Sequence, residues 1–230
     1  MVALIDRPSP NHNGRPEQDG EPRSPDLLVL HYTGMQTGEA ALERLCDPAA
    51  KVSAHYLIEE DGRVFRLVPD HRRAWHAGVA AWAGETDING LSLGIELVNP
   101  GHEFGYRPFP EAQMAALIEL LHVLKTKYRI DPVRVIGHSD AAPLRKTDPG
   151  ELFDWPRLAA EGLARPVPTP QNVVLDASAA RERLAKLGYG FLDEDSGAVI
   201  AAFQRRFRPA EVTGRLDAET AGLLAALTTA

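Results

Sequence analysis

Two histidines and one aspartate stand where the chain could assemble a metal site. His31 follows a short apolar run at residues 27–30, and His138 follows a strand-like run at residues 133–136. Asp148 comes ten residues after His138. Two imidazoles and one carboxylate suit Zn²⁺ and leave the fourth tetrahedral position for water. Taken alone, each histidine also fits a surface or satisfied core position, and Asp148 before Pro149 also fits a turn. Spacing therefore leaves the metal site as one hypothesis.

The elements that must position these residues are strands mixed with helices. Short apolar or alternating runs predict strands at residues 27–30, 55–59, 63–68, 91–98 and 133–136. Asp61-Gly62 between the second and third of these runs is a strong hairpin signal. Helical spacing predicts a long helix over 111–128 and a short one over 39–46. The pattern predicts an α/β domain whose strand ends carry His31 and His138.

The rest of the chain divides by composition. The proline- and glycine-rich start predicts an irregular N-terminal arm, and Arg165 to Pro170 reads as a semi-rigid proline-spaced linker. Beyond it, three short helices are expected at residues 177–187, 196–207 and 218–227. We expect an arm at 1–24, a catalytic domain at 25–165, a linker at 166–171 and a small three-helix domain at 172–230. The linker suggests that the catalytic unit can stand alone.

Charge and cysteine content exclude several classes of protein. There are 25 Lys and Arg residues against 32 Asp and Glu, a net charge of −7, which argues against nucleic acid as the main partner. No apolar run approaches the roughly 20 residues of a membrane span. The single cysteine, Cys46, cannot form an intrachain disulfide and fits a reducing compartment. Nothing in the sequence specifies an oligomeric state.

Six segments, taken together, resemble one enzyme family. They are VLHYTG, VSAHYLIEEDGRVFRLV, RRAWHAG, LSLGIELVNPG, IGHSDAAPLRKTDPG and FDWPRL. Their order is similar to that in the zinc N-acetylmuramoyl-L-alanine amidases of the amidase-2 family, which includes AmpD-like and AmiD-like enzymes. The resemblance covers about residues 25–165. It implies a mixed central sheet flanked by helices and hydrolysis of the amide between (anhydro-)N-acetylmuramic acid and L-alanine, in cell-wall recycling or remodelling.

The resemblance also implies roles for five residues. It makes His31, His138 and Asp148 the ligands of one Zn²⁺ per chain, Glu96 the catalytic carboxylate and Lys146 the stabiliser of the transition state. Zinc lowers the pKa of a bound water toward 7, and Glu96 could carry the proton to the leaving nitrogen. From the residues alone, Glu96 faces either solvent or a cleft, and Lys146 could be an ordinary surface lysine.

Three further residues are candidates for substrate contact. Trp75 and His76 lie in a segment that resembles the cleft lining of the family, where an aromatic face suits a sugar ring. Arg145 could pair with a muropeptide carboxylate, because a guanidinium matches carboxylate geometry. Ordinary packing for Trp75 and His76, and solvent exposure for Arg145, are the alternatives.

The C-terminal part resembles a three-helix peptidoglycan-binding domain. The resemblance rests on residues 184–189, on Phe-Gln-Arg-Arg-Phe at 203–207 and on Thr-Gly-Arg-Leu-Asp at 213–217. The expected partner is thus peptidoglycan or an anhydro-muropeptide, with no nucleic acid and no membrane span.

Two other functions compete with the amidase. One is a catalytically silent peptidoglycan-recognition module, and the other is a zinc peptidase that cuts another muropeptide bond. The start of the chain lacks the pattern of a signal peptide. We therefore expect a cytoplasmic enzyme, with the periplasm as the alternative if an export signal was removed or missed.

Overall fold

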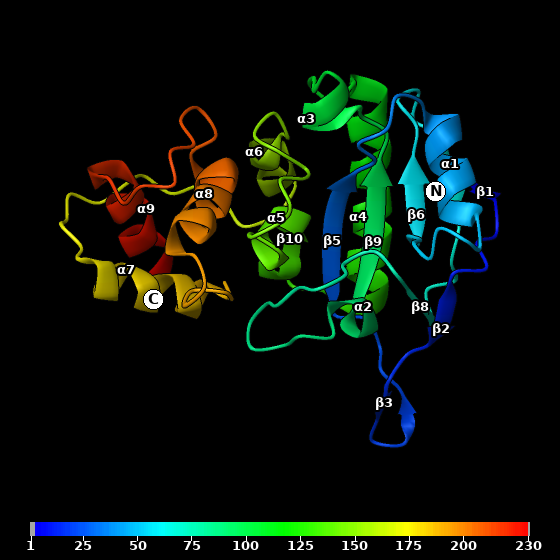
Figure 1. Ribbon diagram of the computed structural model, residues 1–230, viewed down its shortest axis with the longest axis horizontal. Coiled ribbons are helices and arrows are strands. Elements are labelled where there is room, and N and C mark those ends of the chain that lie inside the picture. The colour runs from blue at the N-terminus through cyan, green and yellow to red at the C-terminus, as the bar shows by residue number, and fades with distance from the viewer. Residues whose placement is uncertain (1–2, 230) are drawn as a thin grey trace.

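A six-stranded mixed sheet forms the centre of the larger part of the molecule (Figure 1). The computed structural model describes residues 3–229. The sheet has the order β1-β7-β6-β9-β5-β10 and contains β1 (Leu4–Asp6), β5 (Leu27–Tyr32), β6 (Tyr56–Ile58), β7 (Val64–Arg66), β9 (Ser92–Leu97) and β10 (Val135–Gly137). Within this sheet, as described over residues 3–229, the predicted hairpin β6–β7 is the antiparallel pair and the other neighbouring strands are parallel. The mixed sheet that the family resemblance implied is confirmed.

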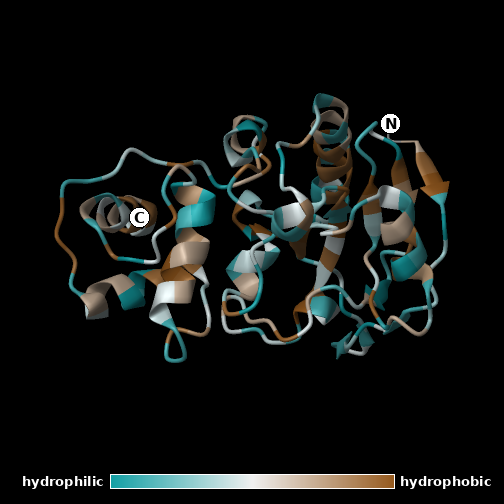
Figure 2. Ribbon diagram, turned by 45° about the horizontal axis from the view of Figure 1, so that its top comes forward, coloured by the Kyte–Doolittle hydropathy of each residue, from teal (hydrophilic) through white to brown (hydrophobic). Residues whose placement is uncertain are grey.

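Helices cover the two faces of this sheet. The long helix α4 (Glu111–Tyr128) has the predicted bounds and packs Met114, Leu117 and Leu121 with apolar residues of β5 and β9. On the opposite face, α1 (Gly38–Cys46) packs Leu42 and Leu45 on Leu57. The shorter helices are α2 (Ile88–Leu91), α3 (Gly101–Phe104), α5 (His138–Ala141) and α6 (Trp155–Ala160), with a 3₁₀ turn at Pro132–Arg134. Figure 2 shows hydrophobic residues concentrated on α4 and the central strands.

The N-terminal arm is not irregular, so this prediction was wrong. β1 adds to the edge of the sheet beside β7, β2 (His12–Gly14) pairs with β8 (Arg72–Ala74), and β3 (Glu17–Gln18) pairs with β4 (Glu21–Pro22). Buried Arg15 donates to the backbone carbonyls of Asp70, Gly90 and Ser92. The side chains of β1 are exposed, and the strand is held at the sheet edge by backbone pairing with β7. The sequence therefore shows no hydrophobic alternation that would reveal this strand.

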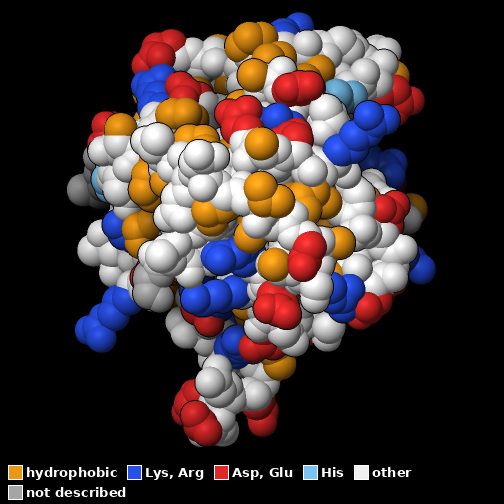
Figure 3. All heavy atoms as spheres, turned by 90° about the vertical axis from the view of Figure 1, so that its left-hand side faces the viewer, with side chains coloured by type: hydrophobic (Ala, Val, Ile, Leu, Met, Phe, Trp, Pro, Cys, Tyr) orange, Lys and Arg blue, Asp and Glu red, His pale blue; other side chains and the backbone are white. Residues whose placement is uncertain are grey.

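The C-terminal part consists of three helices near the predicted positions. They are α7 (Ala177–Leu187), α8 (Ser196–Phe207) and α9 (Ala218–Thr228). Each begins at an aspartate whose carboxylate accepts a backbone N–H of the first turn, namely Asp176, Asp195 and Asp217. Seen from this end, acidic and basic side chains are interspersed and form no continuous basic face (Figure 3). Within residues 3–229, every helix is too short or too polar to cross a membrane.

The helical part shares a hydrophobic core with the sheet domain. One buried cluster joins Leu27 and Val29 of β5 to Phe203 and Leu224 of the helical part. At the same junction Arg206 donates to Asp140 over 2.9 Å and lies over the ring of Trp155 at 4.3 Å. Tyr189 donates to the other oxygen of Asp140 over 2.7 Å. The two parts are therefore packed together rather than merely tethered.

We expect Arg206→Met to destabilise the whole chain by about 3–5 kcal/mol, because it leaves Asp140 as an unpaired buried carboxylate. The measurement is the free energy of unfolding from urea denaturation, with Arg205→Met as the control. Arg205 is the preceding residue on α8 and is only half-buried. Equal stability of the two variants would show that the ion pair contributes nothing to the junction.

Candidate active site

Three neighbouring strands bring the candidate residues to one place. β5 lies between β9 and β10, and the register pairs His31 with Glu96. Both side chains point to the face opposite α4, because Leu30 and Ile95, their neighbours in sequence, pack on the other side. His138 is the first residue of α5, directly after β10. Asp148 is held in the following loop, where its carbonyl accepts the N–H of Ser139 over 2.8 Å.

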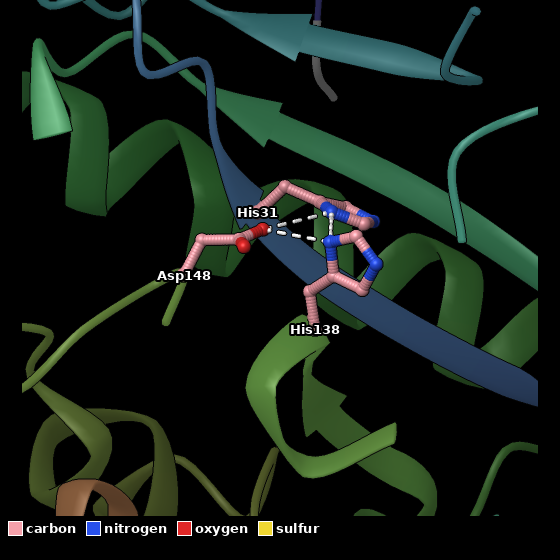
Figure 4. A group of neighbouring side chains, drawn as sticks. All are labelled: His31, His138 and Asp148. Carbon is pink, nitrogen blue, oxygen red and sulfur yellow. Dashed lines mark hydrogen bonds and ion pairs between the residues drawn. The ribbon is translucent and has the colours of Figure 1, made fainter. Parts of the chain in front are cut away.

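His31, His138 and Asp148 converge on a common point (Figure 4). The Nδ1 atoms of the two histidines are 2.9 Å apart, and each lies 3.0 Å from Oδ2 of Asp148. All three side chains are buried. Tetrahedral ligands about 2.0–2.1 Å from zinc lie about 3.3 Å from one another, so this triangle is close to the size that zinc needs.

The protonation of the cluster also fits a cation. His138 Nε2–H donates to the carbonyl of Ala77 over 3.0 Å, which leaves its Nδ1 lone pair facing the other two ligand atoms. Burial, followed by repulsion from His138, lowers the pKa of His31 to about 4, so its ring is neutral at pH 7. Although burial opposes it, the neighbouring His138 and His31 hold the pKa of Asp148 well below its usual range. Two imidazoles and a carboxylate form a ligand set that Zn²⁺ prefers.

Glu96 lies beside this cluster, and its carboxyl group has few hydrogen-bond or charge partners. Within residues 3–229, its Oε2 atom is buried and has no hydrogen-bond partner. Burial, and then the charge of Asp148, raises the pKa of Glu96 well above its usual range, while Lys146 opposes the shift. A carboxyl group with a raised pKa next to a metal site is suited to accepting and returning a proton.

A cavity of about 380 Å³ opens over these residues. It brings together all eight residues proposed from the sequence: His31, Trp75, His76, Glu96, His138, Arg145, Lys146 and Asp148. Lys146 is half-buried, and its positive charge influences both Glu96 and His31. The arrangement places three candidate metal ligands, a buried carboxyl group and an ammonium group around one space.

The three candidate substrate contacts differ in how freely they can bind. Half-buried Trp75 donates its indole N–H to Asn13 over 2.8 Å and leaves its ring beside the cavity. Exposed Arg145 donates to the carbonyls of Val79 and Ala77. Both ring nitrogens of His76 are engaged, one with His31 and one with Ser92, each over 3.1 Å. His76 therefore has no ring nitrogen free for a substrate.

Sequence reasoning missed other residues around the cavity. Exposed Arg44 of α1 lines it, as do Tyr32 and Thr147, which share a hydrogen bond of 2.9 Å. Asn89 accepts the backbone N–H groups of His76 and Ala77 and so fixes that segment. Tyr32 and Thr147 stand next to proposed ligands in sequence, which was an available signal. Nothing in the sequence pattern indicated Arg44 or Asn89.

Comparison with known proteins finds two family regions. Residues 21–151 match the N-acetylmuramoyl-L-alanine amidase family, and residues 175–224 match a putative peptidoglycan binding domain. The amidase AmiD of Escherichia coli is 38% identical over 228 residues, covering 87% of this chain and 81% of AmiD. The 1,6-anhydro-N-acetylmuramyl-L-alanine amidase AmpD of Enterobacter cloacae is 38% identical over 170 residues, covering 66% of this chain and 87% of AmpD.

A solved structure matches over nearly the whole chain. It is the complex of E. coli AmiD with the substrate anhydro-N-acetylmuramic acid-L-Ala-D-gamma-Glu-L-Lys. The TM-score is 0.80 at 35% identity, and the match covers 93% of this chain and 92% of that one. The similarity therefore extends through both the sheet domain and the helical part.

Proposed function

Because this chain belongs to the N-acetylmuramoyl-L-alanine amidase family, it hydrolyses the amide between N-acetylmuramic acid and L-alanine, and we propose that one zinc ion held by His31, His138 and Asp148 serves this reaction. The observation that carries the proposal is the triangle of three buried ligand atoms, 2.9–3.0 Å apart, with Glu96 on the adjacent strand. A silent recognition module would have no use for this combination.

Four other residues around the cavity have separate parts in the proposed hydrolysis. When bound, zinc supplies a Lewis acid that polarises the scissile carbonyl and lowers the pKa of a water molecule to about 7. Glu96 accepts a proton as the water oxygen bonds to the carbonyl carbon, and returns it to the nitrogen as the C–N bond breaks. Lys146 donates to the oxygen that gains negative charge at the carbonyl carbon. Trp75 binds the sugar, and Arg145 binds a peptide carboxylate.

The substrate is an anhydro-muropeptide or a peptidoglycan strand. The first is supported by the muropeptide named in the AmiD complex and by the name of AmpD, and the second by the region similar to a peptidoglycan binding domain. We assign the chemistry to residues 25–165 and wall binding to residues 172–230, joined by 166–171. We propose a cytoplasmic location, with which the single cysteine is compatible, and keep the periplasm as the alternative if an export signal was removed or missed.

The test is a digestion with the full chain, loaded with one equivalent of zinc. A defined anhydro-muropeptide should give two products, the free anhydro-sugar and a peptide with a new amino terminus at L-alanine, identified by mass. Chelation should abolish the reaction, and zinc should restore it. Cleavage within the peptide would identify a peptidase instead. An intact substrate with zinc bound would support the silent module.

A further inference from the structure

The outer nitrogens of both metal-site histidines are bound by one short segment, His76-Ala77. His31 Nε2 lies 3.1 Å from His76 Nδ1, and His138 Nε2–H donates to the carbonyl of Ala77 over 3.0 Å. We propose that His76 is a positioning residue that fixes the tautomer and the ring orientation of His31 through hydrogen bonds anchored at Ser92. This inference rests on the proposed zinc site.

The direction of each hydrogen bond follows from a backbone carbonyl. The hydroxyl of Ser92 lies 2.5 Å from the carbonyl oxygen of Ile88, which has no proton, so the hydroxyl must donate. Having used its only proton, the Ser92 oxygen accepts Nε2–H of His76 over 3.1 Å. His76 Nδ1 is then a lone pair and accepts Nε2–H of His31. The Nδ1 lone pair of His31 is left facing His138 and Asp148, as a metal ligand requires.

The packing around His76 holds this arrangement in place. The side-chain oxygen of Asn89 accepts the N–H groups of His76 and Ala77 over 3.0 and 2.8 Å. Gly94 faces the imidazole, and a Cβ there would lie only 2.4 Å from its Cγ. The rings of His31 and His76 meet edge to face, with centroids 5.1 Å apart. His76 is thus fixed in position as well as in hydrogen bonding, and both of its nitrogens are committed.

The experiment measures the dissociation constant for zinc of the full chain, by competition with a chromogenic chelator. We expect His76→Leu to raise this constant by about 10–100-fold, the usual effect of losing an outer hydrogen-bond partner of a ligand. His76→Gln keeps an acceptor for His31 and should recover part of the loss. Ser92→Ala removes the anchor without disturbing the imidazole directly and should raise the constant about tenfold. This variant also covers the case in which His76→Leu does not fold.

His55→Leu is the control, because His55 is a buried imidazole whose nitrogens contact Arg15, the carbonyl of Arg72 and the N–H of Gly94 instead of a proposed ligand. It should bind zinc as the wild type does. Wild-type affinity in both His76→Leu and Ser92→Ala would overturn the inference and leave the proposed function standing. Equal losses in His55→Leu and His76→Leu would also overturn it, since generic destabilisation would then explain both. A wild-type chain that binds no zinc would instead overturn the proposed function.

Discussion

Glu96→Gln is expected to lower kcat by about 10²–10⁴-fold on a soluble anhydro-muropeptide, the usual range for a lost general base. Glutamine has nearly the same shape but cannot accept the proton of the attacking water. Zinc content should stay at one equivalent, because Glu96 is not among the three converging ligands. KM should change much less, because proton transfer is an interaction of the transition state. Steady-state kinetics and metal analysis of the same preparation provide the measurement.

The control for this variant is Glu60→Gln, which removes a half-buried carboxylate paired with Arg107. It should leave kcat within about twofold of wild type, as expected for a surface ion pair far from the reacting atoms. A loss of less than about tenfold in Glu96→Gln, with zinc intact, would mean that another group accepts the proton. His76 would be a poor replacement, since its two ring nitrogens already bind His31 and Ser92.

His138→Ala is expected to remove most of the zinc and to reduce activity by more than about 10³-fold, because the metal and the chemistry that it supplies are lost together. The substitution removes one corner of the ligand triangle and one of the two donors to the carbonyl of Ala77, the other being Arg145. Zinc content after dialysis and turnover on the same muropeptide give the two readouts.

His122→Ala is the matched control, because His122 is a half-exposed histidine on α4 whose one ion pair, with Glu161, spans 3.6 Å. It should keep both zinc and activity. If His138→Ala were as active and as fully loaded as His122→Ala, His138 would not be a ligand and the assignment of the metal site would be wrong.

Strong periodic patterns predicted most of the fold. The apolar run of β5, the hairpin around Asp61-Gly62 and the helical spacing of α4 all correspond to observed elements. The strands of the N-terminal arm were missed because β1 pairs through its backbone at a sheet edge and keeps its side chains exposed. The docking of the helical part was also missed, because prolines in a linker report local stiffness and carry no information on what the following helices pack against.

The candidate site was predictable only in part. Its residues follow from the family resemblance, and their gathering around one cavity agrees with that expectation. The face on which Glu96 lies could not be derived from its neighbours, since alternation defines two faces without saying which one holds a cleft. The register that pairs it with His31 resolves this. In the hydrogen-bonded link from His31 through His76 to Ser92, the first two residues are 45 positions apart and the last two are 16 apart. The link also depends on the direction of each hydrogen bond, which sequence spacing does not encode.

The buried contact between Arg206 and Asp140, together with the shared core, has a consequence for how a polymer would be bound. A module on a flexible tether contributes through an effective concentration set by the length of the tether. Here the shared core and the Arg206–Asp140 contact hold the helical part at a fixed distance and orientation relative to the cavity. A single muropeptide in the cavity would gain no affinity from the helical part. If the helical part binds glycan as proposed, a glycan strand would gain affinity only where its repeat distance brings a stem peptide over His31 while another stretch lies on α7–α9.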